Sequence, residues 1–186
     1  MTVGFALCGS FCTFSKVIPQ IEILARNYEI YPIMSPVAAE CDTRFGRASD
    51  FVSRIEEICQ MPVITTIAGA EPIGPKKLLD ALIIAPATGN TLAKLALGIT
   101  DTSVTMAAKA HLRNSRPLII APSTNDGLFT SAKNIGLLSS MKNVYFVPYS
   151  QDDAEGKPAS LVAHMEKIPE TLALALEGKQ IQPILA

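Results

Sequence analysis

The chain has 186 residues, of which 48% are hydrophobic and 18% are charged, and its formal net charge is -1. This length fits one domain with a substantial core. The near-neutral charge, with no basic stripe interleaved with aromatic residues, excludes the electrostatic signature of a nucleic-acid-binding protein. The chain is richer in apolar and poorer in charged residues than a typical domain. We therefore expect part of its apolar surface to be covered in a homo-oligomer.

The apolar runs are as long as strands and are interrupted by proline, glycine or charge, so none could span a bilayer. The first seven residues lack the basic start and long apolar centre of a secretion signal, and we expect a cytoplasmic protein. The cysteines show no close pairing, which predicts reduced thiols and no metal site. They are Cys8, Cys12, Cys41 and Cys59. His111 and His164 lie near polar ends of predicted helices, where they would be solvated or would cap the helix.

A strand, a helix and a second strand are predicted within the first 34 residues. Residues 2–8 form the first strand, residues 14–25 have helical apolar spacing around Pro19, which is able to kink the helix, and residues 29–34 form the second strand. The loop at residues 9–13 suits a phosphate held by backbone N–H groups with Ser10 or Thr13, but taken alone it favours a capping turn without ligand. It is not GxGxxG, so the dinucleotide fingerprint is absent.

A polar, irregular stretch at residues 41–47 precedes a predicted helix at residues 49–60. Arg44 and Arg47 stand close together beside an aromatic residue, and two such guanidinium groups could clamp carboxylates through bidentate hydrogen bonds. The alternative is a solvated loop that leads into the helix.

The next segments lead into the most apolar stretch of the chain. Residues 62–66 are predicted as a short strand, residues 67–75 as a mobile Gly/Pro-rich loop and residues 76–80 as a brief helix. Residues 82–85 then read as a strand buried on both faces, and small and hydrogen-bonding residues follow before a helix at residues 92–97. At the carboxyl end of a parallel strand, such a turn is either a ligand-binding loop or an ordinary connection.

The second half repeats the alternation of helix and strand. Asp101 or Thr102 would cap a helix that runs to residue 112. The remaining predicted elements are a strand at residues 117–121, a polar turn at 122–127, a helix at 128–141, a last strand at 144–148, a solvated loop at 151–158 and a helix at 161–176. The alternation predicts a single three-layer α/β/α domain over residues 1–186, with a parallel sheet and a C-terminal helix at about residues 160–178.

Two segments together resemble the flavin-binding family that includes phosphopantothenoylcysteine and peptidyl-cysteine decarboxylases and flavin prenyltransferases. Residues 86–91, PATGNT, are similar to the family's PASANT segment, and residues 122–129, PSTNDGLF, are similar to its PxMNxxMW segment. The resemblance implies a Rossmann-like or flavodoxin-like sheet and an FMN cofactor, with Ser10 and Ser35 near the phosphate. The other cofactor-binding candidates are Gly9, Thr13, Pro86, Thr88, Asn90, Thr91 and Thr102.

Departures from the family pattern argue against cysteine decarboxylation. Pro72 stands where the resemblance implies a catalytic histidine, and proline has no proton to exchange. Thr124 replaces Met and Phe129 replaces Trp in the second segment, whereas Asn125 is retained.

Within the family, the likeness is greatest to one component of a two-component oxidoreductase of endospore-forming bacteria. The resemblance implies oxidation of a dihydrodipicolinate-type heterocycle to pyridine-2,6-dicarboxylate, together with a partner subunit that binds NADP. Arg44, Arg47 and Asn125 are then the candidates for substrate binding, and no catalytic residue is assigned. One alternative is a non-catalytic binding or assembly protein that has kept the fold, and another is an FMN-dependent decarboxylase or prenyltransferase.

Overall fold

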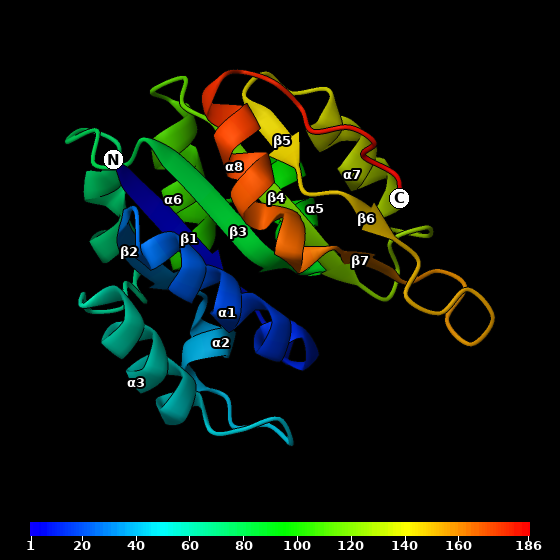
Figure 1. Ribbon diagram of the computed structural model, residues 1–186, viewed down its shortest axis with the longest axis horizontal. Coiled ribbons are helices and arrows are strands. Elements are labelled where there is room, and N and C mark those ends of the chain that lie inside the picture. The colour runs from blue at the N-terminus through cyan, green and yellow to red at the C-terminus, as the bar shows by residue number, and fades with distance from the viewer.

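Five parallel strands form the centre of the molecule (Figure 1), and the computed structural model describes residues 1–186. These strands are β1 (Thr2–Leu7), β2 (Glu29–Met34), β3 (Ala81–Ala87), β4 (Leu118–Thr124) and β5 (Val144–Phe146). They pair in the order β2-β1-β3-β4-β5. The chain thus builds the sheet outward from β1 to β2, and then in the opposite direction from β3 to β5.

Two short antiparallel strands extend the sheet past the carboxyl end of β4. β7 (Leu161–Ala163) pairs with Ser123 and Thr124 of β4, and β6 (Tyr149–Ser150) pairs with β7. The predicted parallel sheet is confirmed in its five central strands, and β6 and β7 add antiparallel pairs at one edge. The strand predicted at residues 144–148 ends at Phe146 and is not the last one, and the prediction of a helix that begins at residue 161 is wrong. A run of three apolar residues cannot be assigned to strand or helix by periodicity alone.

Helices cover both faces of the sheet, which confirms the predicted α/β/α layering (Figure 1). On one face, α1 (Phe14–Ala25) packs beside α8 (Ile168–Leu176). On the other face lie α5 (Gly89–Leu97), α6 (Ser103–Leu112) and α7 (Ala132–Ser139). The shorter elements are α2 (Pro36–Glu40), α3 (Ala48–Cys59), α4 (Ile67–Ala70) and the 3-10 turns η1 (Phe11–Thr13), η2 (Glu71–Ile73) and η3 (Met165–Lys167).

The core follows the two strands at the middle of the sheet. Ile83 of β3 lies opposite Ile119 of β4, Ile84 lies opposite Ile120, and all four side chains are fully buried. Helices on both sides exclude water from these strands, which explains their continuous apolar sequence. The strands predicted at residues 82–85 and 117–121 are confirmed.

The connection between α3 and β3 differs from the prediction. In residues 62–66 only Ile64 bridges a strand, at Ile33 of β2, and α4 and η2 occupy the segment that was predicted as a mobile loop. Residues 76–80 form no helix, because Lys77 adopts a positive φ of 50°. Asp80 instead accepts a hydrogen bond from the backbone N–H of Thr2 at 2.9 Å and fixes the entry into β3.

The helix predicted at residues 128–141 is shorter and begins only at Ala132. The Leu128 N–H donates to the carbonyl of Ala159 at 3.0 Å, and the Phe129 N–H donates to the carbonyl of Asp126 at 2.9 Å. These hydrogen bonds hold residues 126–129 in a turn that is joined to the segment before β7. No helix of the structure combines the length and the apolar character that are needed to cross a membrane.

Candidate functional site

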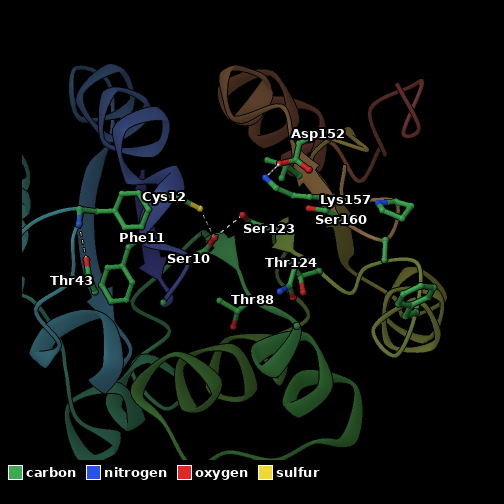
Figure 2. Close-up of a pocket in the computed structure, with 18 residues that line it drawn as sticks. Ser10, Phe11, Cys12, Thr43, Thr88, Ser123, Thr124, Asp152, Lys157 and Ser160 are labelled. Carbon is green, nitrogen blue, oxygen red and sulfur yellow. Dashed lines mark hydrogen bonds and ion pairs between the residues drawn. The ribbon is translucent and has the colours of Figure 1, made fainter. Parts of the chain in front are cut away.

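A pocket of about 770 Å³ opens at the carboxyl ends of β1, β3 and β4 (Figure 2). Its lining comes from residues 9–12 after β1, residues 88–89 after β3 and residues 123–125 at the end of β4. The pocket lies where the strand order reverses, between β1 and β3, and this is the position at which open parallel sheets bind ligands. Residues 151–160, which we call the strap, pass over its other side and connect β6 to β7.

Five residues at the strand ends, Ser10, Thr88, Gly89, Ser123 and Thr124, form what we call the floor. The hydroxyl groups of Ser10 and Ser123 lie 2.8 Å apart and join the end of β1 to the end of β4 across β3. A hydrogen-bonded pair of hydroxyl groups still has a free lone pair or proton to offer a ligand. The floor can therefore bind a polar group such as a phosphate.

The turn between β3 and α5 depends on a glycine. Thr88 caps α5 by accepting the Thr91 N–H at 3.3 Å. A Cβ atom on Gly89 would lie 2.7 Å from oxygen atoms of Thr124, Asp126 and Ser131, which is too close for a real contact. Asp126 accepts hydrogen bonds from Thr124 and from Ser131, so a carboxylate is held directly beside the first residue of α5.

Aromatic rings stand at the mouth of the pocket. Phe11, Phe45 and Phe129 all line it, and Phe129 is 71% exposed. The Arg44 guanidinium lies 4.9 Å from the centre of the Phe45 ring, a cation–π contact. The mouth thus offers flat apolar surfaces to a planar ligand.

Four of the predicted site residues line the pocket, namely Gly9, Ser10, Thr88 and Asn125. The other predicted residues lie outside its lining. They are Thr13, Ser35, Arg44, Arg47, Pro86, Asn90, Thr91 and Thr102.

Capping explains where two of these outlying residues lie. Ser35 accepts the Ala38 N–H and caps α2, and Thr102 forms a reciprocal capping box with Thr105 at the start of α6. Both residues stabilise helix starts. Ser and Thr serve caps and ligands through the same hydroxyl group, so a sequence does not separate these two roles.

The remaining outlying residues support the loops or face solvent. The Thr13 hydroxyl donates to the Ser10 carbonyl at 2.7 Å, and Pro86 lies buried within β3. Arg44 and Arg47 are both exposed, although Thr43 and Phe45 of the same loop reach the pocket. Asn90 is also exposed, one residue past the lining.

The strap was missed in the sequence, where residues 151–158 were predicted to be a solvated loop. Asp152, Lys157 and Ser160 line the pocket opposite the side that carries Thr43 (Figure 2). The exposed, polar character of this segment gave no signal of a site. The sequence feature that could have indicated the strap is the short apolar run of β7. Because β7 pairs with the end of β4, the residues before it lie beside the pocket.

Two buried groups near the sheet take no part in acid–base chemistry near neutral pH. Burial lowers the pKa of His111 to about 4, and its Nε2 lies 3.0 Å from the Pro117 carbonyl, so the prediction of a solvated or capping histidine is wrong. Burial raises the pKa of the Cys8 thiol to about 11.

His164 lies outside the pocket lining, with Nε2 3.0 Å from the Ser150 hydroxyl. No group of three or more His, Cys, Asp or Glu side chains is placed to hold a metal ion.

Residues 1–174 match the flavoprotein family. The chain belongs to the flavoprotein family. It is 45% identical over 184 residues to the B subunit of dipicolinate synthase from Bacillus subtilis, a match that covers 98% of this chain and 92% of that protein.

Two solved structures of flavoprotein-like proteins place the fold. The crystal structure of the B subunit of dipicolinate synthase from Bacillus halodurans C has a TM-score of 0.91 and 44% identity, over 100% of this chain and 95% of that chain. The structure of Burkholderia xenovorans DmrB in complex with FMN has a TM-score of 0.70 and 19% identity, over 95% of each chain, and this likeness supports the fold alone.

Proposed function

We propose that this flavoprotein binds FMN in the pocket and serves as the B subunit of dipicolinate synthase. The observation that carries the proposal is the position of the pocket, at the switch point of the sheet of a chain that is similar over its full length to such a protein. In this role it assists the oxidation of a dihydrodipicolinate-type intermediate to dipicolinate during endospore formation.

The lining fits a flavin nucleotide. A volume of about 770 Å³ lies in the range of small-molecule and cofactor pockets. Gly9 and Ser10, with Ser123 opposite, would hold the phosphate, and Thr88 and Gly89 would lie along the ring system. Of the other candidates, Thr13, Pro86, Asn90 and Thr91 would act by shaping these loops, and Ser35 and Thr102 by starting the adjoining helices.

Aromatisation of the heterocycle removes a hydride and a proton, and a bound flavin or NADP on the partner protein supplies the hydride acceptor. Asn125 would orient the ring or a carboxylate through its amide group. Arg44 and Arg47 would meet the dicarboxylate at the mouth of the pocket, where their loop contributes Thr43 and Phe45. We assign no acid or base.

The A subunit of dipicolinate synthase is the proposed partner, and it would carry the NADP. The present chain has no GxGxxG segment, which suits this division of roles. We further propose that the chain forms a homo-oligomer and works in the cytoplasm of the mother cell. Exposed apolar side chains such as Leu97 and Phe129, each 71% exposed, support the proposal that another copy of the chain covers part of this surface.

The first test is the visible absorption spectrum of the purified chain, before and after FMN is added and the sample is dialysed. A retained flavin band near ~450 nm is expected and would place the cofactor in this chain. The Gly89→Ala variant should lower FMN affinity about tenfold or more, because the new Cβ would displace the oxygen atoms of Thr124, Asp126 and Ser131 and so shift the floor. Gly136→Ala is the matched control, since no atom lies within 4 Å of its Cβ position.

Absence of the band after reconstitution would contradict FMN binding and favour a binding or assembly role without flavin. Turnover of a dihydrodipicolinate substrate should then be measured with the proposed NADP-binding partner, in the presence and absence of this chain. A requirement for this chain supports its proposed role in the synthase. Activity of the isolated chain on a cysteine-containing peptide or a pantothenate derivative would instead support a decarboxylase, although neither histidine lines the pocket.

A further inference from the structure

Among all the residues that line the pocket, one cation and one anion are found, and both lie on the strap. These residues are Lys157 and Asp152, and no arginine or histidine joins them. A negatively charged ligand inside the pocket therefore meets a single full positive charge. Figure 2 shows Lys157 and Asp152 together on the side opposite Thr43, with Ser10 and Ser123 between the two sides.

The backbone of the strap fixes Lys157 at this position. Its N–H donates to the Asp153 carbonyl at 2.8 Å, and its own carbonyl accepts the Ser160 N–H at 2.9 Å. The side chain of Gln151 donates to the Pro158 carbonyl at 2.7 Å and closes the base of the strap. The hydrogen-bonded turn thus fixes the backbone position from which the Lys157 side chain extends.

The ion pair within the strap is weak enough to exchange. Lys157 Nζ lies 3.4 Å from Asp152 Oδ2, and the two side chains are 60% and 35% exposed. Exposed pairs of this kind contribute little to stability, because water and salt screen them. A carboxylate of a ligand can replace Asp152 at small cost.

The other usual place for an anion is already beside a carboxylate. The start of α5 attracts negative charge through its free N–H groups. Asp126 holds an oxygen atom against Gly89, the first residue of that helix, and a second anion there would be repelled. The strap also carries Asp152, Asp153 and Glu155, but Lys157 is the cation that lines the pocket and is therefore the group available to a ligand carboxylate.

We infer that Lys157 forms a carboxylate subsite of the pocket, in which its ammonium group leaves Asp152 to bind one carboxylate of an aromatic acid. This inference rests on the proposed function and deepens it, since it names the residue that selects a dicarboxylate over its neutral analogue. Ser160, buried beside it, contributes a hydroxyl to the same side of the pocket.

The test is isothermal titration calorimetry of the full chain with dipicolinate, picolinate and pyridine, with FMN titrated in parallel. Lys157→Met should weaken dipicolinate binding about tenfold or more and leave FMN affinity unchanged, and Lys157→Arg should restore most of it. Dipicolinate affinity should also fall as NaCl is raised in the wild type and less so in Lys157→Met. Lys133→Met, an exposed lysine of α7 outside the pocket, is the matched control.

The outcomes separate this inference from the proposed function. Unchanged dipicolinate affinity in Lys157→Met would overturn the inference and leave the proposed function standing. Loss of FMN affinity instead would show a phosphate contact and would also overturn it. Binding of picolinate that depends on Lys157, without binding of dipicolinate, would support the subsite and contradict the proposed substrate. No binding of any carboxylate to the wild type would overturn the inference, whereas the flavin spectrum and the turnover assay with the partner would still decide the proposed function.

Discussion

The floor and the strap face each other across one pocket, but they are built differently. The floor continues directly from buried parallel strands, and its hydroxyl groups contact one another from separate strands. The strap is exposed over residues 151–158, and its two charged residues that line the pocket, Lys157 and Asp152, form one weak ion pair. One pocket can therefore combine two kinds of surface. The buried floor suits a tightly bound cofactor, and the exposed, charged strap suits a substrate that binds and dissociates.

The largest expected change in the free energy of unfolding comes from a substitution in the sheet below the floor, and it tests whether the sheet makes the floor rigid. Ile120→Ala should lower the free energy of unfolding by about 2–5 kcal/mol, because Ile120 is fully buried and a cavity would remain. Lys157→Met in the strap should change it by no more than about 0.5 kcal/mol. Urea unfolding followed by circular dichroism measures both, and equal losses would erase the contrast.

An acid titration tests the amino end of β4, where His111 of α6 contacts the Pro117 carbonyl. The folded-state pKa of His111 is about 4, against 6.5 for an ordinary histidine, so the unfolded chain binds more protons in this interval. The contribution of His111 to the free energy of unfolding should be fully present above pH 6.5. It should fall by about 3 kcal/mol as the pH drops to 4. His111→Gln should flatten this part of the profile. A profile that keeps its slope in the variant would assign the loss to other groups.

Within the floor, a smaller loss of stability is expected when the hydroxyl pair of Ser10 and Ser123 is broken. Ser10→Ala and Ser123→Ala should each lower the free energy of unfolding by about 1 kcal/mol, because each removes the same 2.8 Å hydrogen bond. The double variant should cost less than the sum of the two. A double-mutant cycle on unfolding and on FMN affinity measures this coupling, and strict additivity would mean that the floor is not joined across β3.

The apolar strands could be predicted from sequence because burial on both faces leaves a continuous signal. Residues 82–85 and 117–121 show it, and the polar turns after them correctly indicated the edge of the sheet that holds the pocket. Ser123 was assigned to a turn and not to the pocket floor, since pairing with β7 prolongs β4 by residues that have little strand character of their own.

Charge was harder to place than the sheet. Arg44 and Arg47 looked suitable in sequence because they stand together beside an aromatic residue, yet both are exposed outside the lining. Lys157 is separated from the floor residue Ser10 by most of the chain, and only tertiary pairing brings it to the pocket. Local pattern carries no information on contacts of this range.

The pocket collects residues from Gly9 to Val162, and this span has a consequence for how the chain reaches its native state. Contacts between distant parts of a chain close late in folding, because the entropy of a long loop must be overcome first. During synthesis the site stays incomplete until β7 has left the ribosome and docked on β4. A ligand that bridges floor and strap would then bind only the finished fold, so its concentration would raise the midpoint of global unfolding.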